Sequence, residues 1–155
     1  MKKSIICYCI LLLGMLIIPG LSSAQEADTV PELIDDIQVD VKNVIVDAKT
    51  KILTLDLFLI SYQKNPREFK LNTFATQVLD TKGQTYMYST MQMGKVLIKL
   101  SDRQNYLHYF MEDEVPVAFK ITVDNWTKGN KAKAVKLVFE DSAEAGKFIE
   151  KAVNL

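Results

Sequence analysis

In the stretch KILTLDLFLISYQ, residues 51–63, apolar and polar residues alternate almost one by one. Successive side chains of a strand point to opposite faces of a sheet, so this period of two predicts a strand with one buried face. Thr54, Asp56, Phe58 and Ile60 share one face. We expect the other face to belong to the core, and it consists of Leu53, Leu55, Leu57 and Leu59.

The same alternation recurs in EVPVAFKITVDNW (114–126), KVLIKL (95–100) and AVKLVFE (134–140). Each stretch therefore predicts another strand with one apolar face. In the first stretch, Lys120 and Trp126 lie on the face opposite the core. The expected core residues are Val115, Val117, Phe119, Ile121, Val123, Val96, Ile98, Leu100, Val135, Leu137 and Phe139.

Two further stretches change phase partway along. The apolar positions shift by one residue near Lys42–Asn43 in IQVDVKNVIVD (37–47) and near Asn72–Thr73 in FKLNTFATQV (69–78). A shift of one residue moves all later side chains to the other face, so we expect a bulge or a switch between sheets at both places.

The connections between these stretches favour antiparallel pairing. Gly83, Asn65–Pro66 and Gly129 stand where short turns are needed. About seven strands at this spacing predict an all-β fold, an antiparallel two-sheet sandwich.

The last segment, EDSAEAGKFIEKAVNL, predicts an amphipathic helix over 142–153. Asp141 and Glu144 resemble a capping pair, and Ala145, Phe148, Ile149 and Ala152 recur at helical spacing. A strand series that ends in one helix also fits a pleckstrin-homology-like barrel, which is the alternative fold.

Three segments, 41–62, 74–89 and 115–126, resemble immunoglobulin-like domains of unknown function from secreted bacterial proteins. Asp80, Gly83 and Tyr86 fit a D-x-x-G-x-x-Y hairpin motif, and Pro116, Phe119 and Ile121 fit a P-x-x-F-x-I strand motif. The resemblance covers about 39–140, implies an immunoglobulin-like sandwich and brings no catalytic residue with it. We expect the domain, with its terminal helix, to span 34–155.

The first 24 residues have the three parts of a secretory signal. Lys2 and Lys3 precede an apolar run too short for a membrane span of about 20 residues, and Ser22-Ser23-Ala24 suits a signal peptidase. We therefore expect a signal peptide (1–24), a flexible leader (25–33) and export to the periplasm or the cell exterior, without stable membrane insertion.

Removal of the signal would also change the chemistry of the chain. Both cysteines lie within it. The whole chain has 19 basic and 19 acidic side chains, and the loss of two lysines would give the remaining chain a small negative net charge. This composition argues against nucleic-acid binding and against thiol chemistry.

The search for catalytic groups finds little. His108 is the one histidine, it stands among aromatic residues, and no phosphate-binding loop is present. Glu112, Asp113 and Glu114 adjoin and could hold calcium or serve a glycosidase, although a solvated loop is the better interpretation. We expect no cofactor.

Candidate binding residues are aromatic. If the methionines of YMYSTMQM (86–93) face the core, then Tyr86 and Tyr88 stand side by side outside, and Trp126 also lies on a face away from the core. Such aromatic groups suit a protein or a glycan partner. Thr29 and Ser142 resemble O-glycosylation acceptors of the Asp-Ser/Thr-apolar type.

These features together predict a non-enzymatic interaction module of the bacterial envelope, with an unknown protein or glycan as partner and an oligomeric state that the sequence does not indicate. Two alternatives remain open: a carbohydrate-active or calcium-dependent enzyme that uses the acidic run, and a structural spacer of an envelope assembly.

Overall fold

The structure is a computed structural model that describes residues 32–155. The expected signal segment, most of the leader, Thr29 and both cysteines lie outside the described residues. Within the described range the chain is all-β, and its helical content is one 3-10 turn, η1 (Leu100–Asp102). No helix in this range is long and apolar enough to cross a membrane.

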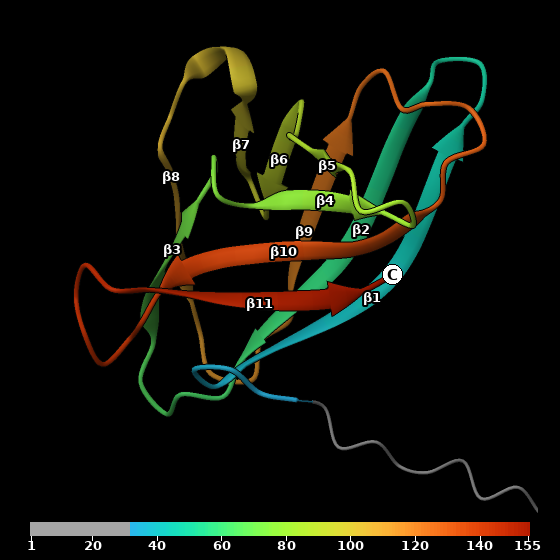
Figure 1. Cartoon of the computed structure of the whole chain (residues 1–155). Helices are drawn as coiled ribbons and strands as arrows, with labels where there is room; N and C mark the ends of the chain where they lie inside the picture. Colours follow the sequence, from blue (N-terminus) through green and yellow to red (C-terminus); the bar gives the residue numbers. More distant parts are fainter. Residues whose placement is uncertain (1–31) are drawn as a thin grey trace, which may run out of the picture. The chain divides into compact units, whose positions relative to one another are not determined.

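The strands form two antiparallel sheets whose long strands run across one another (Figure 1). The first sheet has the order β1-β2-β9-β6-β7, with β1 (Ile37–Asp47), β2 (Ile52–Ser61), β9 (Val117–Val123), β6 (Thr90–Met93) and β7 (Val96–Lys99). The second has the order β5-β4-β10-β3-β8, and β11 also pairs with β10. Its strands are β5 (Thr85–Tyr86), β4 (Gln77–Asp80), β10 (Ala132–Glu140), β3 (Arg67–Asn72), β8 (Tyr106–Met111) and β11 (Phe148–Asn154).

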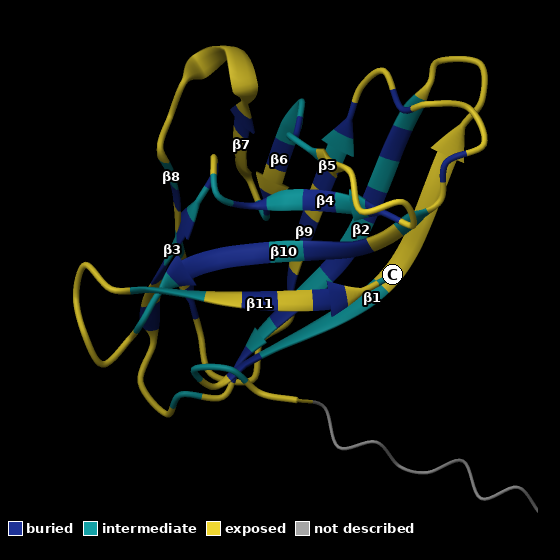
Figure 2. Cartoon of the chain, in the orientation of Figure 1, coloured by how far each residue is buried: buried dark blue, intermediate teal, exposed yellow. Residues whose placement is uncertain are grey.

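Side chains from both sheets meet in one hydrophobic core, an arrangement consistent with a β-sandwich. The four leucines expected from the alternation in β2 are buried, so that prediction is confirmed (Figure 2). The prediction is also confirmed for most apolar positions of β9 and β10, namely Val117, Phe119, Ile121, Val123, Val135, Leu137 and Phe139.

One of the two phase changes is the expected bulge. The register between β1 and β2 shifts between Val41 and Asn43, which leaves Lys42 unpaired with β2. At the second phase change, near Asn72–Thr73, β3 ends at Asn72 and β4 begins at Gln77, and both strands pair with β10. The chain therefore breaks its strand there without changing sheets.

The predicted helix over 142–153 is wrong, because residues 148–154 form β11, which pairs with β10 from Phe148 to Asn154. The helical stripe was ambiguous, since Ile149 and Val153 also share one face of a strand, and the buried Lys151 between them masks the alternation. Gly146 has φ 84° and forms part of the connecting turn. The alternative fold, a pleckstrin-homology-like barrel, was based on the same helix, so the strand at this position removes the reason for it.

The expected number of strands is also wrong, because the described residues contain eleven. The stretch 85–99 divides into three strands of two to four residues, and β5 and β6 belong to different sheets. Strands this short carry too few residues for a period of two to be recognised. Val96, Leu100 and Val115, which we expected in the core, are exposed.

Candidate functional site

The aromatic residues predicted to form a binding face belong to the interior. Tyr88 and Trp126 are each only 1% exposed, and the Tyr86 ring lies 4.4 Å from that of Trp126. The chain passes from the second sheet to the first between Tyr86 and Thr90, so the alternation on which the exposed pair depended does not continue through this segment. The prediction of an exposed tyrosine pair is therefore wrong.

Tyr86 instead joins a polar network around Asp80. The Tyr86 hydroxyl donates to Oδ2 of Asp80 (3.2 Å), and Nδ2 of Asn130 donates to the same carboxylate (2.9 Å). Backbone amides of Lys82 and Gln84 donate to Oδ1 at 2.8 and 2.9 Å. This network connects the β4–β5 hairpin with the loop before β10.

The electrostatics of Asp80 follow from these contacts. Removal from water raises its pKa, but the hydrogen bonds from Gln84, Lys82 and Tyr86, with the nearby Lys82 charge, outweigh that effect. The net result is a lowered pKa, so the carboxylate is ionised at neutral pH. This is a structural role, since the carboxylate is fully buried.

The acidic residues considered for calcium or glycosidase chemistry lie on the exposed loop between β8 and β9. The amide of Glu114 donates to the Ser61 carbonyl at 2.7 Å, so the loop is held against the end of β2 by its backbone. Across residues 32–155, no group of three or more His, Cys, Asp or Glu side chains is placed to hold a metal ion.

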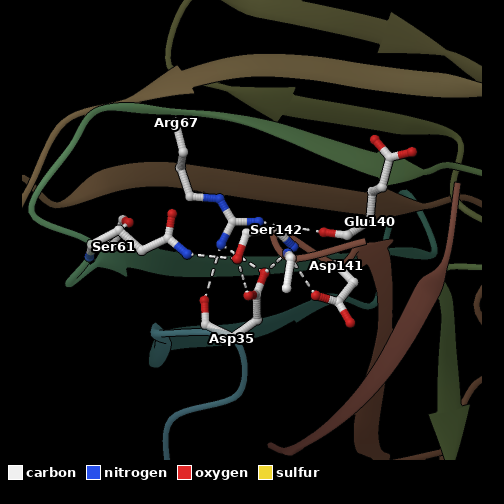
Figure 3. A network of polar contacts seen from close by, with 8 residues as sticks. Asp35, Ser61, Arg67, Glu140, Asp141 and Ser142 are labelled. Carbon is white, nitrogen blue, oxygen red and sulfur yellow. Dashed lines mark hydrogen bonds and ion pairs between the residues drawn. The ribbon is translucent and has the colours of Figure 1, made fainter. Parts of the chain in front are cut away.

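Ser142 lies in the β10–β11 turn, and its side chain is part of a network (Figure 3). Its hydroxyl donates to Asp35 and accepts a hydrogen bond from Nε2 of Gln63 at 2.6 Å. Asp35 also forms an ion pair of 2.7 Å with Arg67, and both side chains are at most 10% exposed. The network ties the turn before β1 to β3 and to the β10–β11 turn.

A groove of about 580 Å³ lies on the outer face of the first sheet, where four strands contribute to its walls. Its volume falls in the range of about 300–1,000 Å³ that is typical of ligand sites. Its lining is Lys42 and Asn43 from β1, Asp56, Leu57 and Phe58 from β2, Ala118, Phe119 and Lys120 from β9, Gln92 from β6, and Gly94.

The bulge in β1 shapes one wall of this groove. Because Lys42 is the extra residue, its side chain lies over the outer face, with Nζ 5.2 Å from the centroid of the Phe58 ring. The same ammonium is 3.9 Å from the Asp40 carboxylate. Phe58 pairs in register with Ala118, whose small side chain leaves space beside the ring.

Charges of both signs line the groove. Nζ of Lys120 lies 3.3 Å from Oδ1 of Asp56, and the second lysine, Lys42, makes the lining positive by one charge. The amide of Gln92 donates to the Gly94 carbonyl at 3.1 Å. Such a surface can accept an apolar side chain beside Phe58 and bind an adjacent carboxylate or carbonyl.

Sequence reasoning did not find this groove. Phe58 and Lys120 were assigned to outward faces, and a bulge was expected at Lys42, yet nothing in the sequence pairs β2 with β9 or β9 with β6. The available signal was the aromatic residue on the polar face of the stretch 51–63.

No family model, curated protein or solved structure matches this chain.

Proposed function

We propose that this chain is an exported, non-enzymatic interaction module with immunoglobulin-like topology, and that it binds a segment of another envelope protein in the groove on the first sheet. The groove is the observation that carries the proposal. It combines an apolar wall, two ammonium groups and the side-chain amides of Asn43 and Gln92 over a volume that suits a few side chains.

The strand order supports the proposed immunoglobulin-like topology. Constant-type immunoglobulin domains have strands A, B, E and D in one sheet and C, F and G in the other. Here β1, β2, β9 and β6 follow the order A-B-E-D, and β3 with β4, then β10 and β11, follow C-F-G. Three strands are additional: β5 comes between the equivalents of C and D, and β7 and β8 come between those of D and E. Topology alone does not define a function.

A protein partner suits the groove better than a glycan. Sugar rings stack on open aromatic faces, whereas the Phe58 ring is half-buried and has Lys42 over it. Tyr88 and Trp126, the other aromatic candidates, are buried. The positive lining favours a partner segment with an apolar residue next to an acidic one.

The test is affinity capture from the envelope of the native organism with residues 25–155 as bait. Ala118→Arg fills the groove beside Phe58, and Ala152→Arg, an exposed alanine on β11, is the matched control. We expect a polypeptide that the unchanged bait and Ala152→Arg retain and that Ala118→Arg loses.

Equal retention by all three folded baits would remove the groove from the proposal. Retention of no polypeptide by the unchanged bait would contradict the binding function itself.

A further inference from the structure

The strand β1 has a free edge. It pairs with β2 on one side and has no strand on the other among residues 32–155, although it is eleven residues long. All residues from Lys42 to Asp47 are exposed, including three consecutive apolar ones: Val44, Ile45 and Val46 are 39%, 53% and 43% exposed. A long apolar edge strand is a template for pairing with another strand.

The exposed valines point to the core side of the sheet. Val44 and Val46 pair in register with Leu55 and Leu53, whose side chains are fully buried. The second sheet covers those leucines but does not extend over the end of β1, which Figure 2 shows as an exposed arrow. The apolar surface thus continues past the edge of the core.

One edge strand of the second sheet, β11, differs. The exposed positions of β11 are Glu150, Ala152 and Asn154, so this edge carries polar and small side chains. Charged and polar residues of this kind discourage pairing. The edge strands β7 and β8 also expose apolar residues, but they have only four and six residues, so β1 offers the longest free edge with consecutive exposed apolar residues.

We propose that a second copy of this chain pairs with that edge, β1 antiparallel to β1, about a two-fold axis at Ile45. Side chains directly opposite each other in an antiparallel pair share a face. This register sets Ile45 against Ile45, Val44 against Val46, and Asn43 against Asp47. In the alternative register, with the two-fold axis at Val44, Lys42 lies opposite Val46 and Asn43 lies opposite Ile45. That register pairs polar with apolar side chains.

Charge complementarity favours the antiparallel orientation. Lys42 precedes the apolar residues and Asp47 follows them, so antiparallel pairing brings each lysine toward the aspartate of the second copy, whereas parallel pairing brings like charges together. Hydrogen bonds from the backbone amide of Lys49 and from Thr50 lower the pKa of Asp47, which is ionised at neutral pH.

The two copies then share one continuous sheet, and both grooves lie on the same face of it because paired residues share a face. Lys42 and Asn43 of each groove adjoin the boundary between the two copies. The inference goes beyond the proposed binding function and does not depend on it. A strip of about five residues per copy predicts a weak, reversible dimer.

The first test is sedimentation velocity of the purified protein over a wide concentration range. The protein is expected to shift from monomer to dimer as concentration rises, and Ile45→Lys is expected to stay monomeric. Leu97→Lys on β7, where Leu97 is 52% exposed, is the matched control and should dimerise. A protein that is monomeric throughout, or a dimer that survives Ile45→Lys, would overturn the proposal.

Disulfide trapping tests the register even if Ile45→Lys fails to fold. With Cys7 and Cys9 replaced by Ser, Ile45→Cys should give a covalent dimer on mild oxidation. Val46→Cys, at another exposed position of the same strand, faces Val44 and should not. Equal cross-linking by the two variants would contradict the axis at Ile45.

Discussion

At the scale of single residues, Gly94 shows how tightly the β6–β7 turn is packed. Its φ is 55°, and a Cβ atom there would lie 2.6 Å from the Tyr109 hydroxyl oxygen and 2.7 Å from a ring carbon. The left-handed backbone alone costs an alanine about 1–2 kcal/mol, and overpacking adds about 1–3 kcal/mol.

Gly94→Ala is therefore expected to lower the free energy of unfolding in urea by more than Gly129→Ala. Gly129 has φ 83° but no atom within 4 Å of the added Cβ, so it isolates the backbone effect. Equal losses in the two variants would contradict the close approach of Tyr109.

The lowered pKa of Asp80 predicts how the stability of the folded protein depends on pH. Its pKa is lowered in the folded protein because the hydrogen bonds from Gln84, Lys82 and Tyr86 outweigh the effect of burial. An unfolded chain takes up the proton first as pH falls, near the ordinary value of about 3.9. The stabilisation is thus complete above that pH and is lost as pH falls through the folded-state pKa.

Melting temperatures measured from pH 7 to pH 2 test this point. Asp80→Asn should melt lower than the unchanged protein at pH 7 and lose less stability on acidification. Lys133→Gln, a change at an exposed position of β10, serves as the control and should keep the unchanged profile. Parallel profiles for Asp80→Asn and the unchanged protein would refute the assigned role.

At the scale of elements, the segment after β10 offers a test in which strand and helix predict opposite signs. In a helix, replacing Gly146 with Ala would stabilise the protein by about 1 kcal/mol. In the observed turn, Gly146 has φ 84°, and Ala should destabilise it by about 1–2 kcal/mol. Urea unfolding of Gly146→Ala decides between them, and a gain in stability would contradict the β10–β11 hairpin.

The same segment shows why sequence patterns fail for some elements. In β2, ten residues alternate without interruption, so one face could be identified as core. In β11, a lysine occupies an inward position, and its ammonium is satisfied by the Glu32 carbonyl, a contact that no local pattern indicates. Long regular strands are therefore predictable, whereas short strands and strands with a buried polar residue are not.

At the scale of the whole molecule, the groove depends on residues distant in sequence. Lys42, Phe58 and Lys120 meet because β1, β2 and β9 are neighbours in one sheet. The bulge at Lys42 was predicted from a phase change, but the order of the strands was not, because alternation identifies faces and not neighbours. The predicted tyrosine pair failed for the related reason that Tyr86 and Thr90 belong to different sheets.

The most direct test of binding through the first sheet is photo-cross-linking in the native organism. A photoreactive amino acid at Gln92, an exposed residue of the groove wall, leaves the space beside Phe58 open, and the same probe at Ala152 lies on the other sheet. We predict a discrete covalent adduct with a different polypeptide from position 92 and none from position 152. Adducts of equal yield from both positions, or none from position 92, would contradict the account.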